Sequence, residues 1–260
     1  MARLFTSDHH FFHRNILKYQ SGYRPFTTVK EMNATLISRW NEKVSPDDDV
    51  YYLGDFTFSL APEQTSDLLS RLHGRKYLIR GNHDASWLES CGFQWAKDHH
   101  DLSLSGGGPY ADLLSSVRLC HYPYIDAEWL HMEPEGIFQR SLSAPPLLDR
   151  LKGQLDLLED RAYDTQRALL LDFYGIEVTE SDAASAEGQR LHAQLTHALR
   201  RLTAHRPRPD GRWLLHGHVH GLWKIKPEER MINVSVEAWQ LAPVSEEELV
   251  DLIIKSAVIT

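Results

Sequence analysis

Short apolar runs of four to six residues alternate along the chain with turn-forming segments rich in Gly, Asp, Asn and Pro. Runs of this length are too short for ordinary helices, and their content of Val, Ile, Leu and Tyr favours strands with at least one buried face. The pattern therefore predicts a strand-rich protein. We expect the strands at residues 2–7, 50–53, 76–80, 117–120, 212–215 and 231–236.

A second pattern, with apolar residues three and four positions apart, predicts helices between these strands. Residues 31–44 carry their apolar side chains on one helical face. A shorter helix around Leu68 ends at Gly74, a residue that commonly stops helices. Ser245 and Glu248 have the spacing of a capping box, which predicts the start of a final helix.

The middle of the chain has a different pattern. Leu and Ala recur at helical spacing over residues 147–162 and again over 191–202, and an acidic segment of small residues lies between them at 177–188. This predicts a helical hairpin that acts as a cap or as an interaction element. The expected organisation is one domain formed by residues 1–124 and 212–260, with a helical insert at 125–211.

The composition is that of a folded globular protein, with 42% hydrophobic and 25% charged residues in a chain of 260. No apolar run approaches the roughly 18 residues of a membrane-spanning helix. The first ten residues already hold one Asp and two His, which no secretory signal would contain. Cys91 and Cys120 lack metal-binding spacing and suit a reducing compartment, so we expect a cytoplasmic protein. The net charge of −8 argues against strong, sequence-independent binding to long nucleic acids.

Histidines and acidic residues gather where the predicted strands end. Eight of the fifteen histidines lie in four short stretches of sequence. Open sheets with parallel strands place ligand sites beyond the carboxyl ends of those strands, so side chains at several such ends can converge. The residues at the five strand ends are Asp8 and His10, Asp55, Asn82 and His83, His121, and His218 and His220.

Two aspartates, one asparagine and four of these histidines form a ligand set without thiolate. A mixed shell of oxygen and nitrogen suits Mn, Fe, Zn, Ni or Co. Seven ligands are too many for one tetrahedral ion, but they suit two ions that share a bridging carboxylate. Two ions about 3.5–4 Å apart can activate water and clamp a phosphoryl group, so the set predicts phosphoryl chemistry.

The same motifs carry a resemblance to a known family. Their flanking sequences, such as TSDHHFFHRNIL and YLIRGNHD, resemble the small bacterial and phage branch of the calcineurin-like metallophosphoesterases. The resemblance covers nearly all of residues 1–124 and 212–243, whereas the expected insert departs from that compact pattern. The motifs that resemble the family, in kind and in order, are DHH at 8–10, GD at 54–55, GNHD at 81–84, CHYP around His121, and GHVH at 217–220.

The resemblance implies an α/β fold, in the form of an α+β sandwich with two packed mixed β-sheets flanked by helices and the site along one sheet edge. It implies two divalent cations, with Mn expected ahead of Fe, Zn, Ni, Co or Mg, and a hydroxide held between them as the attacking group. By resemblance, one cation would be bound by Asp8, His10 and His220, the other by Asn82, His121 and His218, and both by Asp55.

His83 would not bind metal in this resemblance. Its implied role is to contact the phosphate and to assist the leaving oxygen, with Asp84 as its hydrogen-bonding partner. Both residues also have an ordinary structural interpretation, because Gly, Asn and Asp form turns and Asp84 can cap a following helix. His216, next to the last motif, can orient a metal ligand or simply pack within its strand.

Further polar residues are candidates for substrate contacts. His13, Asn15 and Arg80 are the candidates beside the motifs, although Asn15 can equally cap a helix. Arg24 and Arg80 can bind phosphate, but a solvated arginine is the commoner case. The basic stretch Arg200–Arg212 can attract an anionic substrate or a nucleic acid strand, or it can serve as a solvated linker.

Together these expectations describe an enzyme, a metal-dependent phosphoesterase that cleaves phosphodiesters, phosphomonoesters or both. Because a large insert beside the site favours an enclosed pocket, nucleotides or nucleic acid ends are the expected substrates. The alternative is a catalytically silent metal-binding scaffold whose insert recruits a protein partner. A metallo-β-lactamase-type site needs His-x-His-x-Asp-His, and HGHVHG at 216–221 contains no Asp. No membrane partner is expected, and the oligomeric state stays open.

Overall fold

The computed structural model describes residues 1–58, 60–106, 108–124 and 206–259. The chain divides into two compact units, one formed by Met1–Tyr124 with Pro209–Thr260 and the other by Ile125–Arg208. Nearly all of the described residues belong to the first unit. The helical hairpin expected at 125–211 lies almost entirely outside the described residues, so it stays a prediction.

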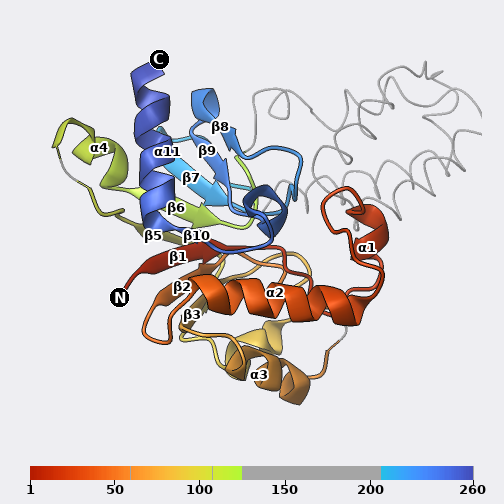
Figure 1. Cartoon of the computed structure of the whole chain (residues 1–260). Helices are drawn as coiled ribbons and strands as arrows, with labels where there is room; N and C mark the ends of the chain where they lie inside the picture. Colours follow the sequence, from red (N-terminus) through yellow and green to blue (C-terminus); the bar gives the residue numbers. More distant parts are fainter. Residues whose placement is uncertain (59, 107, 125–205, 260) are drawn as a thin grey trace, which may run out of the picture. The chain divides into compact units, whose positions relative to one another are not determined.

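The first sheet has the strand order β10-β1-β2-β3-β4 (Figure 1). β1 (Arg3–Thr6), β2 (Asp49–Tyr52), β3 (Arg75–Ile79) and β4 (Ala96–Lys97) run parallel, and β10 (Val244–Ser245) pairs antiparallel with β1. Because β1, β2 and β3 are parallel neighbours, their carboxyl ends meet at one edge of the sheet. The predicted strands at residues 2–7, 50–53 and 76–80 are therefore confirmed to within about two residues at each end.

The second sheet has the order β5-β6-β7-β9-β8. β6 (Val117–Cys120), β7 (Trp213–His216) and β9 (Met231–Asn233) are parallel, and β5 (His99–Leu102) and β8 (Ile225–Lys226) form antiparallel edges. β9 is shorter than the predicted strand at 231–236. The reason is that the Asn233 side chain accepts a hydrogen bond from the Ser235 backbone at 2.9 Å, which turns the chain into the 3-10 helix η5 (Val236–Trp239).

Helices flank the sheets (Figure 1). α2 (Val29–Lys43) begins where the Thr28 side chain accepts a hydrogen bond from the Glu31 backbone, and α3 (Pro62–Ser70) follows β2. α11 (Glu246–Ile259) begins at the predicted capping box, in which the Glu248 carboxylate accepts from the Ser245 backbone at 2.9 Å. The shorter helical segments are α1 (Ile16–Tyr19), η1 (Ser86–Cys91), η2 (Gly108–Tyr110), α4 (Ala111–Leu114) and η4 (Pro227–Glu229).

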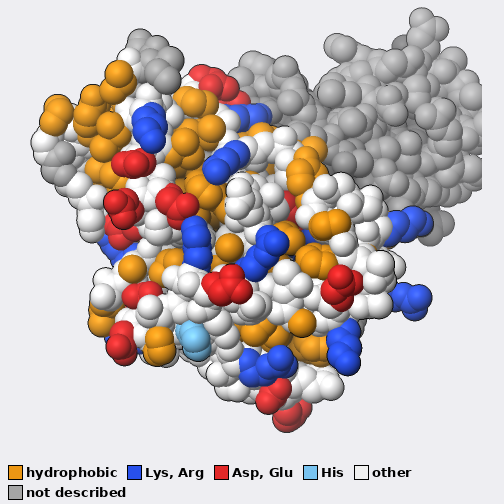
Figure 2. Space-filling view, in the orientation of Figure 1, with side chains coloured by type: hydrophobic (Ala, Val, Ile, Leu, Met, Phe, Trp, Pro, Cys, Tyr) orange, Lys and Arg blue, Asp and Glu red, His pale blue; other side chains and the backbone are white. Residues whose placement is uncertain are grey.

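None of the helices in the described part of the chain has the length and apolar character that a membrane crossing requires. On the face that Figure 2 shows, basic and acidic side chains are interspersed rather than separated by sign. Some of the surface charges are paired, as Lys43 and Glu248 are at 2.8 Å.

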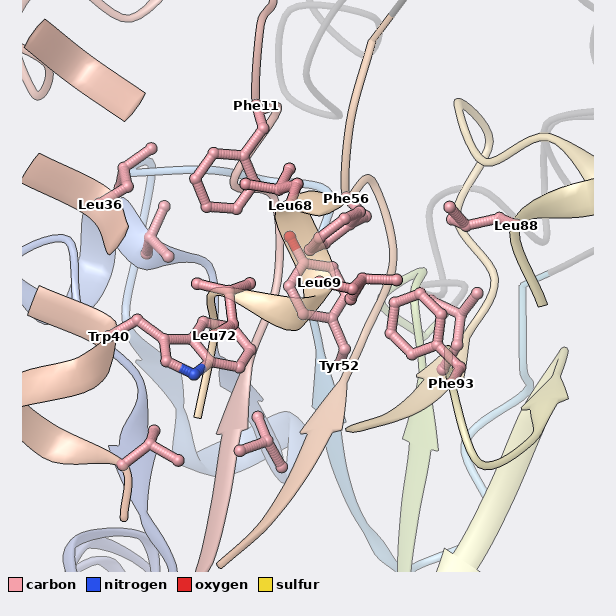
Figure 3. Close-up of a cluster of buried hydrophobic side chains, with 14 of the residues drawn as sticks. Phe11, Leu36, Trp40, Tyr52, Phe56, Leu68, Leu69, Leu72, Leu88 and Phe93 are labelled. Carbon is pink, nitrogen blue, oxygen red and sulfur yellow. The ribbon is translucent and has the colours of Figure 1, made fainter. Parts of the chain in front are cut away.

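The central strands are buried on both faces, because successive side chains point to opposite sides. In β1, Leu4 joins a core that α2 and α3 cover, and the next residue, Phe5, joins a core that both sheets share. Figure 3 shows the first of these cores, in which Trp40 lies beside Leu72 and Tyr52. Each fully buried large apolar side chain contributes about 1.5–3 kcal/mol. The two cores therefore hold the strand ends in fixed positions, and this fixes the geometry of the site.

The chain leaves and re-enters the first unit at neighbouring points. The Tyr124 hydroxyl lies 3.3 Å from Asp210 Oδ1 and 3.2 Å from the Arg212 carbonyl oxygen. Arg212 in turn donates to Asp210 through Nε at 3.0 Å. The two ends of the intervening segment are therefore held together by contacts within the first unit itself.

Candidate metal centre

The loops that follow the strands carry unusual backbone conformations. Asp8, His10 and Asp55 have φ angles of 57°, 48° and 60°, and His218 and His220 have 71° and 50°. These residues are five of the nine non-glycine residues with positive φ in the described ranges. Residues with a Cβ avoid this region, so the packing around them must hold each of them there. Such strain concentrates at functional sites, and it supports the prediction that these loops form one.

Glycines let the loops approach one another closely. A Cβ atom on Gly81 would overlap Asp55 Oδ1, and one on Gly217 would overlap Asp8 Oδ2. The glycines before Asn82 and His218 therefore leave the space that the two carboxylates occupy.

Asp8, His10 and His220 form the first group of converging side chains. Each offers one ligand atom, and these atoms all lie within 4.8 Å of one another. All three residues are buried. Asp8 is held by a hydrogen bond from Ser235 Oγ at 2.8 Å and by the His218 backbone, which lies 3.1 Å from both carboxylate oxygens.

Asp55 lies between the first group and His121. Its Oδ2 atom is 3.5 Å from His10 Nε2 and 3.5 Å from His121 Nε2. Asp8, Asp55 and His121 form a second set whose ligand atoms lie within 4.8 Å of one another. Asp55 thus lies within 3.5 Å of a ring nitrogen from the first group and of His121.

Asn82 and His218 complete the cluster around His121. Asn82 Oδ1 lies 3.0 Å from His121 Nε2 and 3.2 Å from His218 Nδ1. Asn82 itself is exposed, whereas both histidines are buried. The structure therefore brings all seven predicted ligands, from five strand ends, into one cluster.

The unmet bonding capacity of the cluster fits a metal ion. Both ring nitrogens of His10 are buried and have no hydrogen-bond partner among the described residues. The opposite ring nitrogen of His121 does have one, because Nδ1 donates to the Leu53 carbonyl at 2.8 Å and leaves Nε2 directed at Asp55. A histidine held in this way presents a lone pair to a cation. The donor set and its geometry fit divalent cations.

Burial shifts the pKa values of several residues in the cluster. Burial raises the pKa of Asp8 and lowers the pKa of His10, so burial favours the neutral form of each. Burial alone would also lower the pKa of His121, but the nearby carboxylates of Asp55 and Asp8 outweigh it and raise that pKa. A bound cation would offset the buried negative charge of these carboxylates.

His83 and Asp84 are positioned by the same loop but have different contacts from those expected. The His83 backbone donates to Asp55 Oδ1 at 3.0 Å, and its ring lies 5.4 Å from the ring of His10. Asp84 accepts hydrogen bonds from three backbone amides, those of Asp55, Phe56 and Gly81, at 2.8–2.9 Å. The expected hydrogen bond from His83 to Asp84 is not among those of the described residues, because the carboxylate faces the inside of the loop.

The candidate substrate contacts fall into different surroundings. His13 is buried, its ring stacks on Phe58 at 4.2 Å, and it lies 5.4 Å from the ring of His10. Asn15 is exposed at the start of α1, and its carbonyl accepts from the backbone of that helix. Arg80 pairs with Glu89 and, at 3.3 Å, with Asp98, so its charge is already balanced. Of these three residues, His13 alone has a ring contact with a predicted ligand.

Glu237 was not predicted from the sequence, and Arg24 was predicted only as a phosphate contact or a solvated arginine. Glu237 Oε1 lies 3.0 Å from His220 Nδ1 and 2.6 Å from Arg24 Nη2. Both side chains of the Arg24–Glu237 pair are fully buried, so Arg24 is not a solvated arginine. An acidic residue within the apolar run of residues 231–239 was the available signal, because a buried carboxylate needs a partner. His216, by contrast, donates from Nδ1 to the Gly217 carbonyl at 2.7 Å and packs against Trp223.

Comparison with known proteins agrees with this geometry. The family model for the calcineurin-like phosphoesterases matches residues 1–222. The chain belongs to this family. Metal-dependent hydrolysis of phosphate esters is the activity that this membership implies. The mixed two-sheet sandwich and the metal-binding cluster at its strand ends are both consistent with the family.

Individual relatives show to which branch of the family the chain is similar. The Gene 66 protein of Mycobacterium phage L5 is 26% identical over 253 residues, which cover 96% of this chain and 92% of the phage protein, and it supports the bacterial and phage branch. The uncharacterized protein MJ1445 of Methanocaldococcus jannaschii is 49% identical over 79 residues, but the match spans only 30% of this chain and 44% of the archaeal protein. The protein of unknown function AQ665 from Aquifex aeolicus has the same fold, with a TM-score of 0.51 and 21% identity over 97% of this chain and 99% of its own.

Proposed function

We propose that this phosphoesterase works with two divalent cations that share Asp55. The observation that carries the proposal is the position of Asp55 Oδ2, which is 3.5 Å from a ring nitrogen of His10 on one side and of His121 on the other. When bound, the two cations would supply the charge that activates water and stabilises the transferring phosphoryl group. Asp8, His10 and His220 would hold the first cation, and Asn82, His121 and His218 the second.

His83 is the residue that we propose for the leaving oxygen. Its backbone amide is fixed on Asp55 Oδ1, and its ring stands beside His10 and is less buried than the four histidines of the cluster. A ring in this place can donate a proton to an oxygen that leaves the phosphorus atom. Asp84 acts through the loop, since its three backbone contacts fix the turn that carries both Asp55 and His83. We therefore propose Asp84 as a positioning residue.

We propose nucleotides or nucleic acid ends as substrates, and the rim of the site supports this choice. Phe12 and Tyr23, which are 43% and 46% exposed, belong to segments next to the ligands. Phe12 follows His10 by two residues, and Tyr23 packs on Gly221, which follows His220 directly. Bases stack on exposed aromatic rings with about 1–3 kcal/mol per base. His13 is the further candidate that we retain for substrate contact, because its ring lies beside His10.

A screen of the purified full-length chain tests the reaction. Chromogenic phosphate monoesters and diesters are offered with Mn, Ni, Co, Zn or Mg after removal of bound metal by a chelator. We expect turnover that requires metal, with Mn most effective, and higher rates with diesters that carry a nucleoside. Metal binding without turnover of any ester would instead favour the silent scaffold. Turnover that persists in excess chelator would contradict both interpretations.

We propose that residues 125–211 form an insert in the phosphoesterase domain, with the domain itself made of residues 1–124 and 212–260. The contacts of Tyr124 with Asp210 and Arg212 support this division, because they hold the two ends of the segment together. Replacing residues 125–208 with a short Gly-Ser linker should therefore leave the domain folded and able to bind metal. Calorimetric metal titration and thermal unfolding test this expectation. An unfolded deletion variant would show that the segment is part of the core domain.

A further inference from the structure

A buried chain of charges links two of the predicted ligands, Asp8 and His220. The Arg24 guanidinium donates to Glu237 Oε1 through Nε at 2.8 Å and through Nη2 at 2.6 Å, and the same oxygen lies 3.0 Å from His220 Nδ1. The side chains of Arg24 and Glu237 are both fully buried. The forked contact from the permanently charged Arg24 favours the ionised form of Glu237.

The other end of Arg24 holds the loop after β1. Its Nη2 atom donates to the Asp8 carbonyl at 2.5 Å, and Nη1 donates to the His9 carbonyl at 2.7 Å. These carbonyls belong to the backbone segment in which Asp8 and His10 have positive φ. One guanidinium thus stabilises the strained loop that carries Asp8 and His10 and, through Glu237, orients His220.

The two predicted subsites differ in this respect. In the second group, the His121 ring is oriented by a neutral backbone carbonyl, that of Leu53 at 2.8 Å. In the first group, the His220 ring is oriented by the carboxylate of Glu237, and this carboxylate is in turn paired with Arg24. A carboxylate that accepts the Nδ1 proton leaves the Nε2 lone pair for a cation and makes it more basic. The difference should appear as a difference in affinity between the two subsites.

We propose that Arg24 and Glu237 are positioning residues that assemble the first cation subsite, made by Asp8, His10 and His220, and that they have little effect on the second. The inference rests on the proposed function, since it concerns the same pair of cations. A buried ion pair alone seldom stabilises a fold more than a well-packed apolar pair would. Here, however, both ends of the ion pair contact metal-ligand segments, one through His220 and the other through the Asp8 and His9 carbonyls.

Titration of the metal-free, full-length protein with Mn²⁺ tests the proposal. Calorimetry counts the sites and gives their two dissociation constants, and electron paramagnetic resonance detects the exchange-coupled ion pair. For the wild type we expect two sites. For Glu237→Gln, which keeps the shape of the side chain but removes its charge, the first-subsite Kd should rise about 10–100-fold. The second-subsite Kd should stay within about twofold, and the coupled-pair signal should need correspondingly more Mn²⁺.

Two further variants separate positioning from folding. Arg24→Lys keeps the charge but loses the forked contacts, so it should weaken the first subsite in the same direction. Glu246→Gln is the matched control, because Glu246 also pairs with an arginine, Arg3, but has no contact with the cluster. The control should leave both dissociation constants unchanged. If Glu237→Gln does not fold, the double variant Arg24→Met with Glu237→Gln leaves no unpaired buried charge and is titrated instead.

The outcomes of the titration are distinct. Unchanged Kd values in the folded Glu237 and Arg24 variants would overturn the inference, and so would an equal loss at both subsites, which is what a general structural role would give. A wild type that binds fewer than two Mn²⁺ ions would overturn the dinuclear proposal itself. Selective loss at the first subsite, with the second intact and the Glu246 control unaffected, is the expected result.

Discussion

The two ends of the parallel strands in the first sheet differ in how their charged side chains are paired. We call them the amino edge, where β1, β2 and β3 begin, and the carboxyl edge, where these strands end. At the amino edge, β1, β2 and β3 begin with Arg3, Asp49 and Arg75, which are neighbours in register and alternate in sign. Arg75 Nε donates to Asp49 Oδ1 at 2.7 Å, and Arg3 Nε donates to Glu246 Oε2 at 2.5 Å on α11. Each of these three charges has an opposite charge beside it.

At the carboxyl edge, the carboxylates of Asp8 and Asp55 form no ion pair with an arginine or lysine of the described residues. Asp8 and Asp55 are both buried, and the ion-pair partners of Asp55 in the described chain are two histidines, His10 and His121. Three of these residues also have positive φ. This arrangement costs stability, whereas the paired amino edge contributes modestly to it. The sheet thus separates its two tasks, with stability at one edge and chemistry at the other.

The largest expected effect comes from removing the carboxylate at the centre of the carboxyl edge. Asp55→Asn should lower hydrolysis by on the order of 10³-fold or more, because the shared ligand of the two cations is lost. The fold should persist, and the metal-free variant should be at least as stable as the wild type, since a buried negative charge has been removed. Steady-state kinetics and thermal unfolding measure the two effects.

The matched control is Asp49→Asn at the amino edge of the same strand. It should leave kcat/KM within about twofold, because Asp49 contacts Arg75 and Tyr77 rather than the cluster. Equal loss of activity in both variants would show that the two edges do not divide their tasks as described.

The convergence of these side chains was predictable because each stands within a few residues of a strand end, and short apolar runs locate such strands. Asp55 after VYYL and Asn82 after KYLIR are examples. The Arg24–Glu237 contact spans 213 residues and could not be predicted, since no local pattern relates the two positions. The hydrogen-bond partners of Asp84 could not be predicted from the sequence either, because they are backbone amides whose direction depends on the loop after β2. The positions of the strand ends could therefore be predicted from the sequence, whereas the hydrogen bonds and ion pairs that hold the predicted ligands in place could not.

The second largest effect is the stabilisation of the carboxyl edge by metal. Anything that binds only the folded state stabilises it by RT ln(1 + [L]/Kd), which is about 2.7 kcal/mol at one hundred times Kd. Saturating Mn²⁺ should thus raise Tm by roughly 5–10 °C, and chelator should reverse the change. Asp55→Asn should lose most of this shift and Asp49→Asn should keep it. An equal Mn²⁺ shift in both variants would place the binding elsewhere.

A smaller effect is expected when a pair at the amino edge is broken. Glu246→Gln removes the charge that faces Arg3, where the two side chains are 12% and 26% exposed. Partly exposed pairs contribute about 1 kcal/mol or less, so urea unfolding should show a loss of that size. The Mn²⁺-induced rise in Tm should be unchanged. If Glu246→Gln had normal stability but bound metal more weakly, the amino edge would contribute to metal binding rather than to stability, contrary to this prediction.

The smallest effect concerns the pH dependence of stability at the amino edge. Asp48, in the turn before β2, accepts hydrogen bonds from the Ala2 backbone at 2.6 Å and from the Ser45 backbone at 2.9 Å. These donors lower the pKa of Asp48 below its ordinary value of 3.8 despite some desolvation. The folded state thus binds the proton less tightly than the unfolded state, so the contribution to stability is present above pH 3.8 and is lost as the pH falls through the folded pKa.

Urea unfolding of the chelated protein between pH 2.5 and pH 6 tests this dependence. The difference in unfolding free energy between the wild type and Asp48→Asn should be constant above about pH 5 and should shrink as the pH falls below the ordinary carboxyl pKa. Asp47→Asn, at the exposed neighbouring position, is the matched control and should give a difference near zero throughout. A difference that grows towards low pH would have the wrong sign for a carboxylate stabilised by backbone donors. Because Asp48 has no contact with the cluster at the other edge, added Mn²⁺ should shift both curves equally.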